Sequence, residues 1–359
     1  MSNQQYQRPP IKVAIIGCGR SMFSSHYPVF KAHPSLFNVV CVCDMFKDRR
    51  DIVEKDFPNC KMFRQFSDML DEHGIDLVDI ATGSALHQKH AMMALEKGFW
   101  TLLETPMALT VDESLLIRGA AAKAKNKLIV MQRGLFAPDF LLAKSVIGDE
   151  RLGEIYEIQI RNEDYVRLDD WQAVKRMGGG AAYYAMTDLV IQALRLMPGP
   201  PIQMWSDLKR IASLGDAEDY AKVMFKTRSN VTVDIVYNGG CLEKNRSPSF
   251  VIRGERGEFR VMPGASIGVL SVIDPKFKLT RRRSSVRTPD LVDLHENLPV
   301  VEIPVTLPAE TQTGPSAFWR NVYKTVRTAA PFPISIEESM DAVRYVHLMK
   351  KTSPFGMGN

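Results

Sequence analysis

The sequence predicts an α/β protein in which a parallel sheet wound by helices is followed by a larger, mostly antiparallel sheet. Its 359 residues suit about two domains. The first part alternates short apolar runs with helical patterns, which is typical of crossover connections between parallel strands. The second part carries several strand-like segments in succession. We place the boundary after residue 133, giving domains at 1–133 and 134–359.

Five apolar runs in the first domain are predicted strands of the parallel sheet. They are nearly continuous and rich in aliphatic residues, as expected when helices cover both faces of a sheet. Helical patterns at 86–97 and 111–125 supply two of the covering helices. The strands are expected at 11–16, 39–43, 77–81, 100–103 and 128–131.

The second domain is predicted to be α+β, with helices on one face of a large, open sheet. Its strands mostly follow one another without a helix between them, so they would pair mainly antiparallel. Helices are expected at 180–196, 316–327 and 336–350. Strands are expected at 153–161, 221–226, 231–237 and 250–261.

Composition and charge exclude several classes of protein. Hydrophobic residues make up 45% of the chain, enough to bury two cores. The 46 basic and 41 acidic side chains leave a net charge of +5, a weak bias that predicts neither nucleic-acid nor membrane binding. The polar first residues and the odd count of five cysteines indicate a cytoplasmic protein with reduced thiols. Neither Cys41 with Cys43 nor His87 with His90 completes a metal-ligand pattern, so we expect no metal site.

The first predicted strand ends in a glycine-containing turn that points to a bound dinucleotide. Glycines at such a turn let the backbone approach a pyrophosphate at the N-terminus of the next helix. Met22 occupies the place of the usual third glycine, so the turn alone does not distinguish a nucleotide site from an ordinary tight turn. The candidate cofactor-binding residues are Gly17, Cys18, Gly19, Arg20, Ser21 and Met22.

Asp44 strengthens this interpretation because it ends the second predicted strand. A carboxylate at that place can accept hydrogen bonds from the ribose hydroxyls of NAD. Lys47, Arg49 and Arg50 follow it and would pair with the 2′-phosphate of NADP, although such a run is also typical of the exposed start of a helix. We therefore predict a Rossmann domain that binds NAD, and NADP stays open.

Segments along almost the whole chain, in the same order, resemble the glucose-fructose oxidoreductase/inositol dehydrogenase family, also called Gfo/Idh/MocA. The glycine turn leading to His26 is similar to the family's first motif, and 82–87 resembles its Thr-Pro-x-x-x-His loop. The stretch 91–104 is similar to the family's Ala-Leu-x-x-Gly-x-x-Val-x-x-Glu segment. Further matching segments follow at 152–155, 178–180, 253–259 and 318–349.

This resemblance implies an NAD(P)-binding Rossmann domain and a second domain whose front face binds a small molecule, a sugar or a cyclitol. It implies hydride transfer between the nicotinamide and a carbon that bears a hydroxyl or carbonyl. It also implies a homo-oligomer, a dimer or tetramer, formed through the open sheet. By their places in the motifs, Thr82, His87, Glu104 and Thr105 are candidate cofactor-binding residues.

The sequence departs from the family at the catalytic positions. The Glu-Lys-Pro motif reads Glu104-Thr105-Pro106, and Thr105 cannot act as a general acid near neutral pH. After the triple glycine, Tyr184 stands where the family has Asp and Asp188 where it has His. We predict Tyr184, Asp188 and Thr105 as catalytic residues, with Tyr184 and Asp188 on one face of a helix. Either a hydrogen bond from Asp188 makes Tyr184 the acid or base, or burial raises the pKa of Asp188 so that it is the base. The alternative is that the tyrosines only pack and the cleft is vestigial.

Three further residues are candidates for substrate binding. Arg167 and Trp171 lie in the segment that leads to the triple glycine, which in the family skirts the substrate cleft. Tyr183 lies beside the predicted catalytic tyrosine. A solvated loop for the first two and a packing role for Tyr183 are the alternatives.

Three functions stay open on these residues. The leading hypothesis is an NAD(P)-dependent oxidoreductase of a specialised pathway, acting on a small polar, sugar-derived substrate. The second is an imine or double-bond reductase, whose proton can come from water or from the substrate. The third is a catalytically silent dinucleotide-binding sensor or partner subunit, because Lys, Asp and His are lost together.

Overall fold

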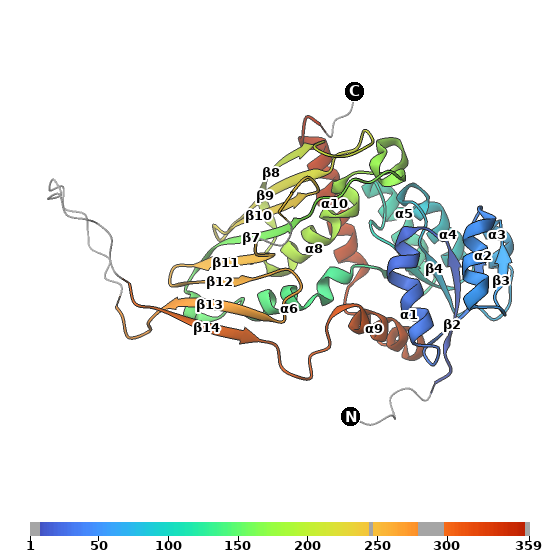
Figure 1. Ribbon diagram of the computed structural model, residues 1–359, viewed down its shortest axis with the longest axis horizontal. Helices are drawn as coiled ribbons and strands as arrows, with labels where there is room; N and C mark the ends of the chain where they lie inside the picture. Colours follow the sequence, from blue (N-terminus) through green and yellow to red (C-terminus); the bar gives the residue numbers. More distant parts are fainter. Residues whose placement is uncertain (1–7, 244–246, 279–297, 356–359) are drawn as a thin grey trace.

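Two sheets, joined by shared helices, make up the protein (Figure 1). The computed structural model describes residues 8–243, 247–278 and 298–355. Within these residues no helix is both long and apolar enough to cross a membrane. The predicted fold class, a parallel α/β part followed by an α+β part with a mostly antiparallel sheet, is confirmed.

The first sheet is parallel and has six strands in the order β3-β2-β1-β4-β5-β6. The order reverses between β1 and β4, and a crevice for a ligand forms at such a reversal, outside the carboxyl ends of the strands. All five predicted strands are present, and β3, a short strand at the sheet edge, was missed. The strands are β1 (Ile11–Ile16), β2 (Phe37–Cys43), β3 (Lys61–Phe63), β4 (Leu77–Ile80), β5 (Trp100–Leu103) and β6 (Leu128–Val130).

Helices connect these strands and cover the sheet. In α5, Thr110 and Glu113 form a reciprocal capping box that fixes the start of the helix. The turn after β1 continues through a short π-helix, η2 (Met22–His26), directly into α1. The helices are α1 (Tyr27–Ala32), α2 (Lys47–Asp56), α3 (Phe66–Leu70), α4 (His87–Glu96) and α5 (Val111–Lys123).

The second sheet has eight strands in the order β14-β13-β12-β11-β7-β10-β9-β8. Neighbouring strands are antiparallel except β7 and β10, which run parallel. The predicted strand region 250–261 divides into two strands, β11 and β12. The strands are β7 (Ile155–Glu163), β8 (Pro201–Lys209), β9 (Tyr220–Thr227), β10 (Thr232–Asn238), β11 (Phe250–Gly254), β12 (Gly257–Val261), β13 (Ile267–Ile273) and β14 (Val300–Thr306).

Helices of the second half cover one face of this sheet and also reach the first sheet. Helices α6, α8 and α10 pack on the eight strands, and α10 continues onto α5 and β6 (Figure 1). The ring of Trp319 in α9 packs edge-on against His26, Phe30 and Phe37 of the first half. We propose that the two domains divide after residue 133 and that the helices of the second half connect the two sheets. They are α6 (Pro138–Ser145), α7 (Ala181–Tyr184), α8 (Met186–Leu196), α9 (Gly314–Thr328) and α10 (Ile336–Thr352).

Candidate active site

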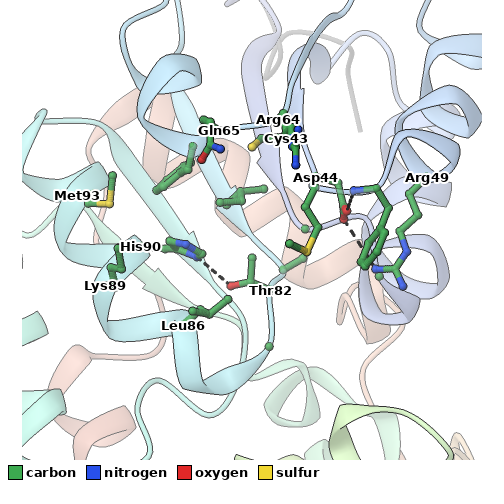
Figure 2. Close-up of a pocket in the computed structure, with 18 of the residues that line it drawn as sticks. Cys43, Asp44, Arg49, Arg64, Gln65, Thr82, Leu86, Lys89, His90 and Met93 are labelled. Carbon is green, nitrogen blue, oxygen red and sulfur yellow. Dashed lines mark hydrogen bonds and ion pairs between the residues drawn. The ribbon is translucent and has the colours of Figure 1, made fainter. Parts of the chain in front are cut away.

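A groove of about 470 Å³ lies at the carboxyl ends of β1, β2 and β4, where the strand order reverses. Asp44 and Arg49 line one side, and Thr82 and His90 line the other (Figure 2). A smaller cavity of about 50 Å³ continues past Thr82 to Thr105. The two together trace the course that an extended dinucleotide would take across the sheet.

The glycine turn leaves an open cradle for a phosphate group. Gly17 has a φ of +94°, and a Cβ there would lie 2.7 Å from the carbonyl oxygen of Ala81. A Cβ on Gly19 would meet no atom within 4 Å, so its backbone borders open space. The side chains of Cys18 and Met22 are buried in the core, so only their backbone can serve a cofactor. The turn fits a dinucleotide pyrophosphate.

Asp44 is held in place by the backbone. Its Oδ2 accepts the amide of Cys18 at 2.8 Å and its Oδ1 accepts the amide of Phe46 at 2.9 Å. Each oxygen keeps lone-pair capacity for a ribose hydroxyl. The Arg49 guanidinium lies 3.9 Å from Oδ2 and over the Phe46 ring, and Arg64 lines the same groove. A 2′-phosphate would meet these two cations, and a ribose with free hydroxyls would meet Asp44.

The other two basic residues after Asp44 have local roles. Lys47 is exposed and pairs with Asp51 one turn along α2, at 2.8 Å. Arg50 donates to the backbone carbonyl of Asp44. Neither lines the groove, so Arg49 is the member of this run that faces it.

A buried chain of charged side chains underlies the turn. His26 donates from Nδ1 to Asp79 at 2.7 Å and from Nε2 to Glu104 at 2.9 Å. Glu104 also accepts the hydroxyl of Ser21 at 2.5 Å and the amide of Thr105 at 3.0 Å. The predicted cofactor-binding residues Ser21, Glu104 and Thr105 are therefore linked, and Glu104 positions the other two.

The pKa values favour an ion pair between His26 and Glu104. Burial lowers the pKa of His26, but the charges and hydrogen bonds of Asp79 and Glu104 outweigh it and raise the pKa to about 9. Burial raises the pKa of Glu104, but the hydrogen bond and charge of His26 bring it down to about 2. Burial also raises the pKa of Asp79, against the charge of His26. An imidazolium between two carboxyl groups satisfies both ring nitrogens as donors.

His87, predicted to bind the cofactor, lies behind the groove instead. It is buried, with Nδ1 at 2.7 Å from the carbonyl oxygen of Pro106 and Nε2 at 2.9 Å from that of Thr82. Burial lowers its pKa. His87 thus ties the Thr82 loop to the loop after Thr105. Thr82 itself lines both cavities, and its hydroxyl lies 3.2 Å from Nδ1 of His90 (Figure 2).

Trp171, predicted to bind substrate, borders the dinucleotide groove. It lines both cavities, and a Cβ on Gly83 would lie 3.5 Å from its ring. The flanking residues hold Arg20 of the glycine turn, which forms an ion pair with Asp170 at 2.7 Å and a hydrogen bond with Gln172. Arg20 therefore holds the segment around Trp171 against the glycine turn.

The other two predicted substrate residues lie outside both cavities. Arg167 is exposed, and its Nε donates to the carbonyl oxygen of Ala212 at 3.3 Å. Tyr183 is half-buried, its hydroxyl donates to the carbonyl oxygen of Leu109 at 3.4 Å, and the Lys350 ammonium lies 4.4 Å from its ring centre. These contacts indicate structural roles.

The single helix predicted at 180–196 is interrupted between Tyr184 and Asp188. Helix α7 ends at Tyr184 and α8 begins at Met186, with Ala185 at φ −120° between them. Tyr184 packs edge-on against Tyr237, with ring centres 5.5 Å apart, and the two hydroxyls share a hydrogen bond. Burial and this neighbour raise the pKa of Tyr184 far above its ordinary value. Asp188 forms its contacts elsewhere.

Asp188 lines neither cavity and lies beside the turn after β6, where a Cβ on Gly134 would be 3.6 Å from its Cβ. Its Oδ1 is buried and has no hydrogen-bond partner among the described residues. Its carboxyl group accepts a backbone hydrogen bond from Gly134. Burial raises the pKa of Asp188 to about 7, the charge of Arg133 opposes the rise, and the charge of Glu104 adds to it. A carboxyl group that titrates near neutrality can serve as an acid or a base at physiological pH.

Arg133 belongs to this site and was not predicted. It opens the short turn η4 (Arg133–Phe136) after β6, beside β5, which leads to Glu104. Its charge lowers the pKa of both Glu104 and Asp188. The signal in the sequence is a cation just after a strand, at the edge where ligand sites form.

Comparisons with known proteins agree with this architecture. Residues 11–132 match the model of an oxidoreductase family with an NAD-binding Rossmann fold, and residues 140–260 match the GFO/IDH/MocA C-terminal domain. The chain is 22% identical to the scyllo-inositol 2-dehydrogenase (NADP(+)) IolW of Bacillus subtilis over 96% of this chain and 94% of that protein. It is 29% identical to an uncharacterised oxidoreductase of Schizosaccharomyces pombe over 70% of each chain.

A solved structure shows the same fold over nearly the full length. The WlbA dehydrogenase of Bordetella pertussis, in complex with NADH and UDP-GlcNAcA, aligns with a TM-score of 0.75 at 20% identity and covers 96% of each chain. Both halves of the present chain thus have their counterparts in one family. The chain belongs to the Gfo/Idh/MocA family of NAD(P)-dependent oxidoreductases.

Proposed function

We propose that the protein interconverts a hydroxyl and a carbonyl group on a small, sugar- or cyclitol-derived substrate, with Asp188 exchanging the hydroxyl proton. The observation that carries this proposal is the buried, unpartnered Oδ1 of Asp188 in a carboxyl group whose pKa is raised to about 7. The family's lysine and histidine are absent, and Asp188 is a carboxyl group within electrostatic reach of Glu104 and Arg133 whose pKa lies in the range that this proton exchange needs.

In this proposal different residues bind the cofactor, contact the reacting oxygen and exchange the proton. The glycine turn, Asp44 and Thr82 would hold NAD, which accepts or returns the hydride when bound. Thr105, whose amide is held by Glu104, would place its hydroxyl against the reacting oxygen. Asp188 in its ionised form would take the proton from a substrate hydroxyl, and in its neutral form it would return that proton to a carbonyl oxygen.

The names of relatives support the substrate class. Beside the scyllo-inositol dehydrogenase, a D-glucoside 3-dehydrogenase of Escherichia coli is 27% identical over 147 residues. Both names describe oxidation of a ring hydroxyl. A polyhydroxylated ring of this size is therefore the substrate class to test first.

We also propose that the protein works as a homo-oligomer, a dimer or tetramer, through the face of the eight-stranded sheet opposite α8. Side chains on that face form ion pairs across strands, with Asp234 held by Arg161 at 3.1 Å and by Lys222 at 3.0 Å. Trp205 and Met224 pair across β8 and β9 and are both exposed. Light scattering during size-exclusion chromatography tests this, and a monomer at micromolar concentration would contradict it.

We place the protein in the cytoplasm. All five cysteines are free thiols, as expected in a reducing compartment. Fractionation of cells that produce a tagged chain tests this placement.

The function is tested by turnover with a panel of ring polyols and their ketones, followed as NADH absorbance, with a cyclic imine included. We expect Asp188→Asn to lower kcat about 100-fold or more, because the amide cannot take a proton, and to leave NADH affinity unchanged. For alcohol oxidation, kcat of the native enzyme should rise with pH through about 7, where Asp188 loses its proton. Asp169→Asn removes an exposed carboxylate and serves as the control.

Two outcomes would overturn this assignment. If Asp188→Asn turns over at the native rate, the carboxyl group is not the proton acceptor. If the imine alone is reduced, the chain carries out the reductase chemistry that needs no protein acid.

A further inference from the structure

A half-buried cation stands unpaired beside the proposed proton acceptor. Among residues 8–243, 247–278 and 298–355, the side chain of Arg133 forms no hydrogen bond and no ion pair. Glu104, whose pKa the charge of Arg133 lowers, is instead engaged by His26. A half-buried guanidinium whose donors have no partner among the described residues has them free to bind an anionic ligand.

The fold fixes where Arg133 lies relative to the reaction site. Strands β5 and β6 pair in register, with Leu103 opposite Val130, so the segments that carry Glu104 and Arg133 leave the sheet side by side. Gly134, next in the chain, lies against Asp188, since a Cβ there would be 3.6 Å from the Asp188 Cβ. Gln192 of α8 fixes this turn through the carbonyl oxygen of Gly134 at 2.9 Å.

This place is not the pyrophosphate site. The strand order β1-β4-β5-β6 puts two strands between the glycine turn and Arg133. At about 4.8 Å between neighbouring strands, the separation is roughly 14 Å across the sheet. The ligand that Arg133 receives is therefore not the phosphate held at the glycine turn.

We propose that Arg133 binds a carboxylate group of the substrate and thereby orients the reacting carbon between Thr105 and Asp188. This inference rests on the proposed function, and it narrows the substrate from ring polyols to hydroxy acids such as uronic or cyclitol carboxylic acids. A guanidinium presents two parallel donors that match the two oxygens of a carboxylate.

The charges around Arg133 favour a singly charged anion over a phosphate. Glu104 and Asp188 are both within electrostatic reach of Arg133, whose charge lowers the pKa of each. A phosphate dianion would face these two carboxyl groups with a single cation to balance it. One carboxylate matches the one unpaired guanidinium.

Matched acid and amide probes test the proposal on the NADH-saturated protein. We would titrate D-glucuronate against D-glucuronamide, quinate against quinamide, and lactate against lactamide, by calorimetry. We expect at least one acid to bind about 10- to 100-fold more tightly than its amide, as for a charge-assisted hydrogen bond. Arg133→Gln should bring the two members of that pair within about threefold of each other, and Arg133→Lys should keep part of the difference. NADH affinity should stay at the native value in both variants.

Two results would overturn the inference: that no acid binds more tightly than its amide, or that the preference for an acid survives Arg133→Gln. Its failure differs from failure of the proposed function. If the inference alone fails, neutral polyols are oxidised, Asp188→Asn abolishes their turnover, and Arg133→Gln leaves it intact. If the proposed function fails, no hydroxyl or carbonyl substrate is turned over although NADH binds.

Discussion

The buried histidine below the glycine turn offers a quantitative test of the structure through the change His26→Gln. Glutamine keeps a donor but carries no charge, so Asp79 and Glu104 are left buried without a cation. The pKa of His26 rises from 6.5 to about 9 on folding. At 1.36 kcal/mol per pH unit this corresponds to about 3 kcal/mol. Removal of one partner of a buried ion pair costs a similar amount.

The pH dependence separates this effect from simple loss of packing. Because the folded pKa of His26 is raised, its stabilising contribution is complete below pH 6.5 and is lost as the pH rises through about 9. The free energy of unfolding of the native protein should therefore fall by about 3 kcal/mol across this window, relative to the variant. The lowered pKa of Glu104 reflects the same contact with His26. The stabilisation of the folded state that the Glu104 carboxylate contributes is lost as the pH falls from 4.5 towards 2.

Urea unfolding followed by tryptophan fluorescence at pH 6, 7.5 and 9 measures both quantities. His73→Gln, at an exposed position, is the matched control and should unfold like the native protein. The reasoning is refuted if His26→Gln and native protein differ by less than about 0.5 kcal/mol at pH 6, where the full difference is expected. It is also refuted if both lose stability equally between pH 6.5 and 9.

Further predictions concern the groove and its surroundings. Gly17→Ala should abolish NADH binding and destabilise the fold by about 1–3 kcal/mol, because its Cβ would lie 2.7 Å from a carbonyl oxygen at a φ of +94°; Gly119→Ala, where a Cβ meets nothing within 4 Å, should fold and bind NADH normally. Tyr184→Phe should lower kcat by less than about tenfold, since its hydroxyl faces Tyr237; a loss as large as that of a catalytic residue would reinstate it as the acid or base. Asp170→Asn should lower the Kd for NADH about two- to fivefold in a fluorescence titration, because it frees the Arg20 guanidinium from an exposed ion pair. An unchanged or higher Kd would show that Asp170 does not compete with NADH for Arg20.

Much of the fold follows from hydrophobic patterning. The core strands of the first sheet are nearly continuous apolar runs, such as 77–81, because helices cover both faces of the sheet. Such runs can be recognised as strands in the sequence. The edge strand β3 was missed because it has only three residues and none of them is buried. The region 250–261 reads as one strand, and its division depends on Gly254, where a Cβ would lie 2.1 Å from the carbonyl oxygen of Leu152. Such a tertiary contact leaves no periodic signal.

The candidate site was predictable only where local sequence determines position. The glycine turn and Asp44 follow from the ends of two strands, which is a local property. The break at Ala185 is not local, since no glycine or proline marks it. Asp79 lies within an apolar strand, so its link to His26 is visible only after β4 and η2 come together. Arg133 was overlooked because its effect on the pKa of Glu104 arises only when β5 and β6 pair in the sheet.

The packing of α9 against the first sheet has a consequence for how the chain folds during synthesis. Trp319 lies at the centre of an aromatic cluster with Phe30 and Phe37, which belong to the first elements to leave the ribosome. Until α9 emerges, these two rings have no tryptophan to cover them and stay open to solvent or to a chaperone. The nucleotide-binding half therefore completes its core only after nearly the whole chain has been made. A fragment that ends at residue 133 should aggregate where the full chain stays in solution.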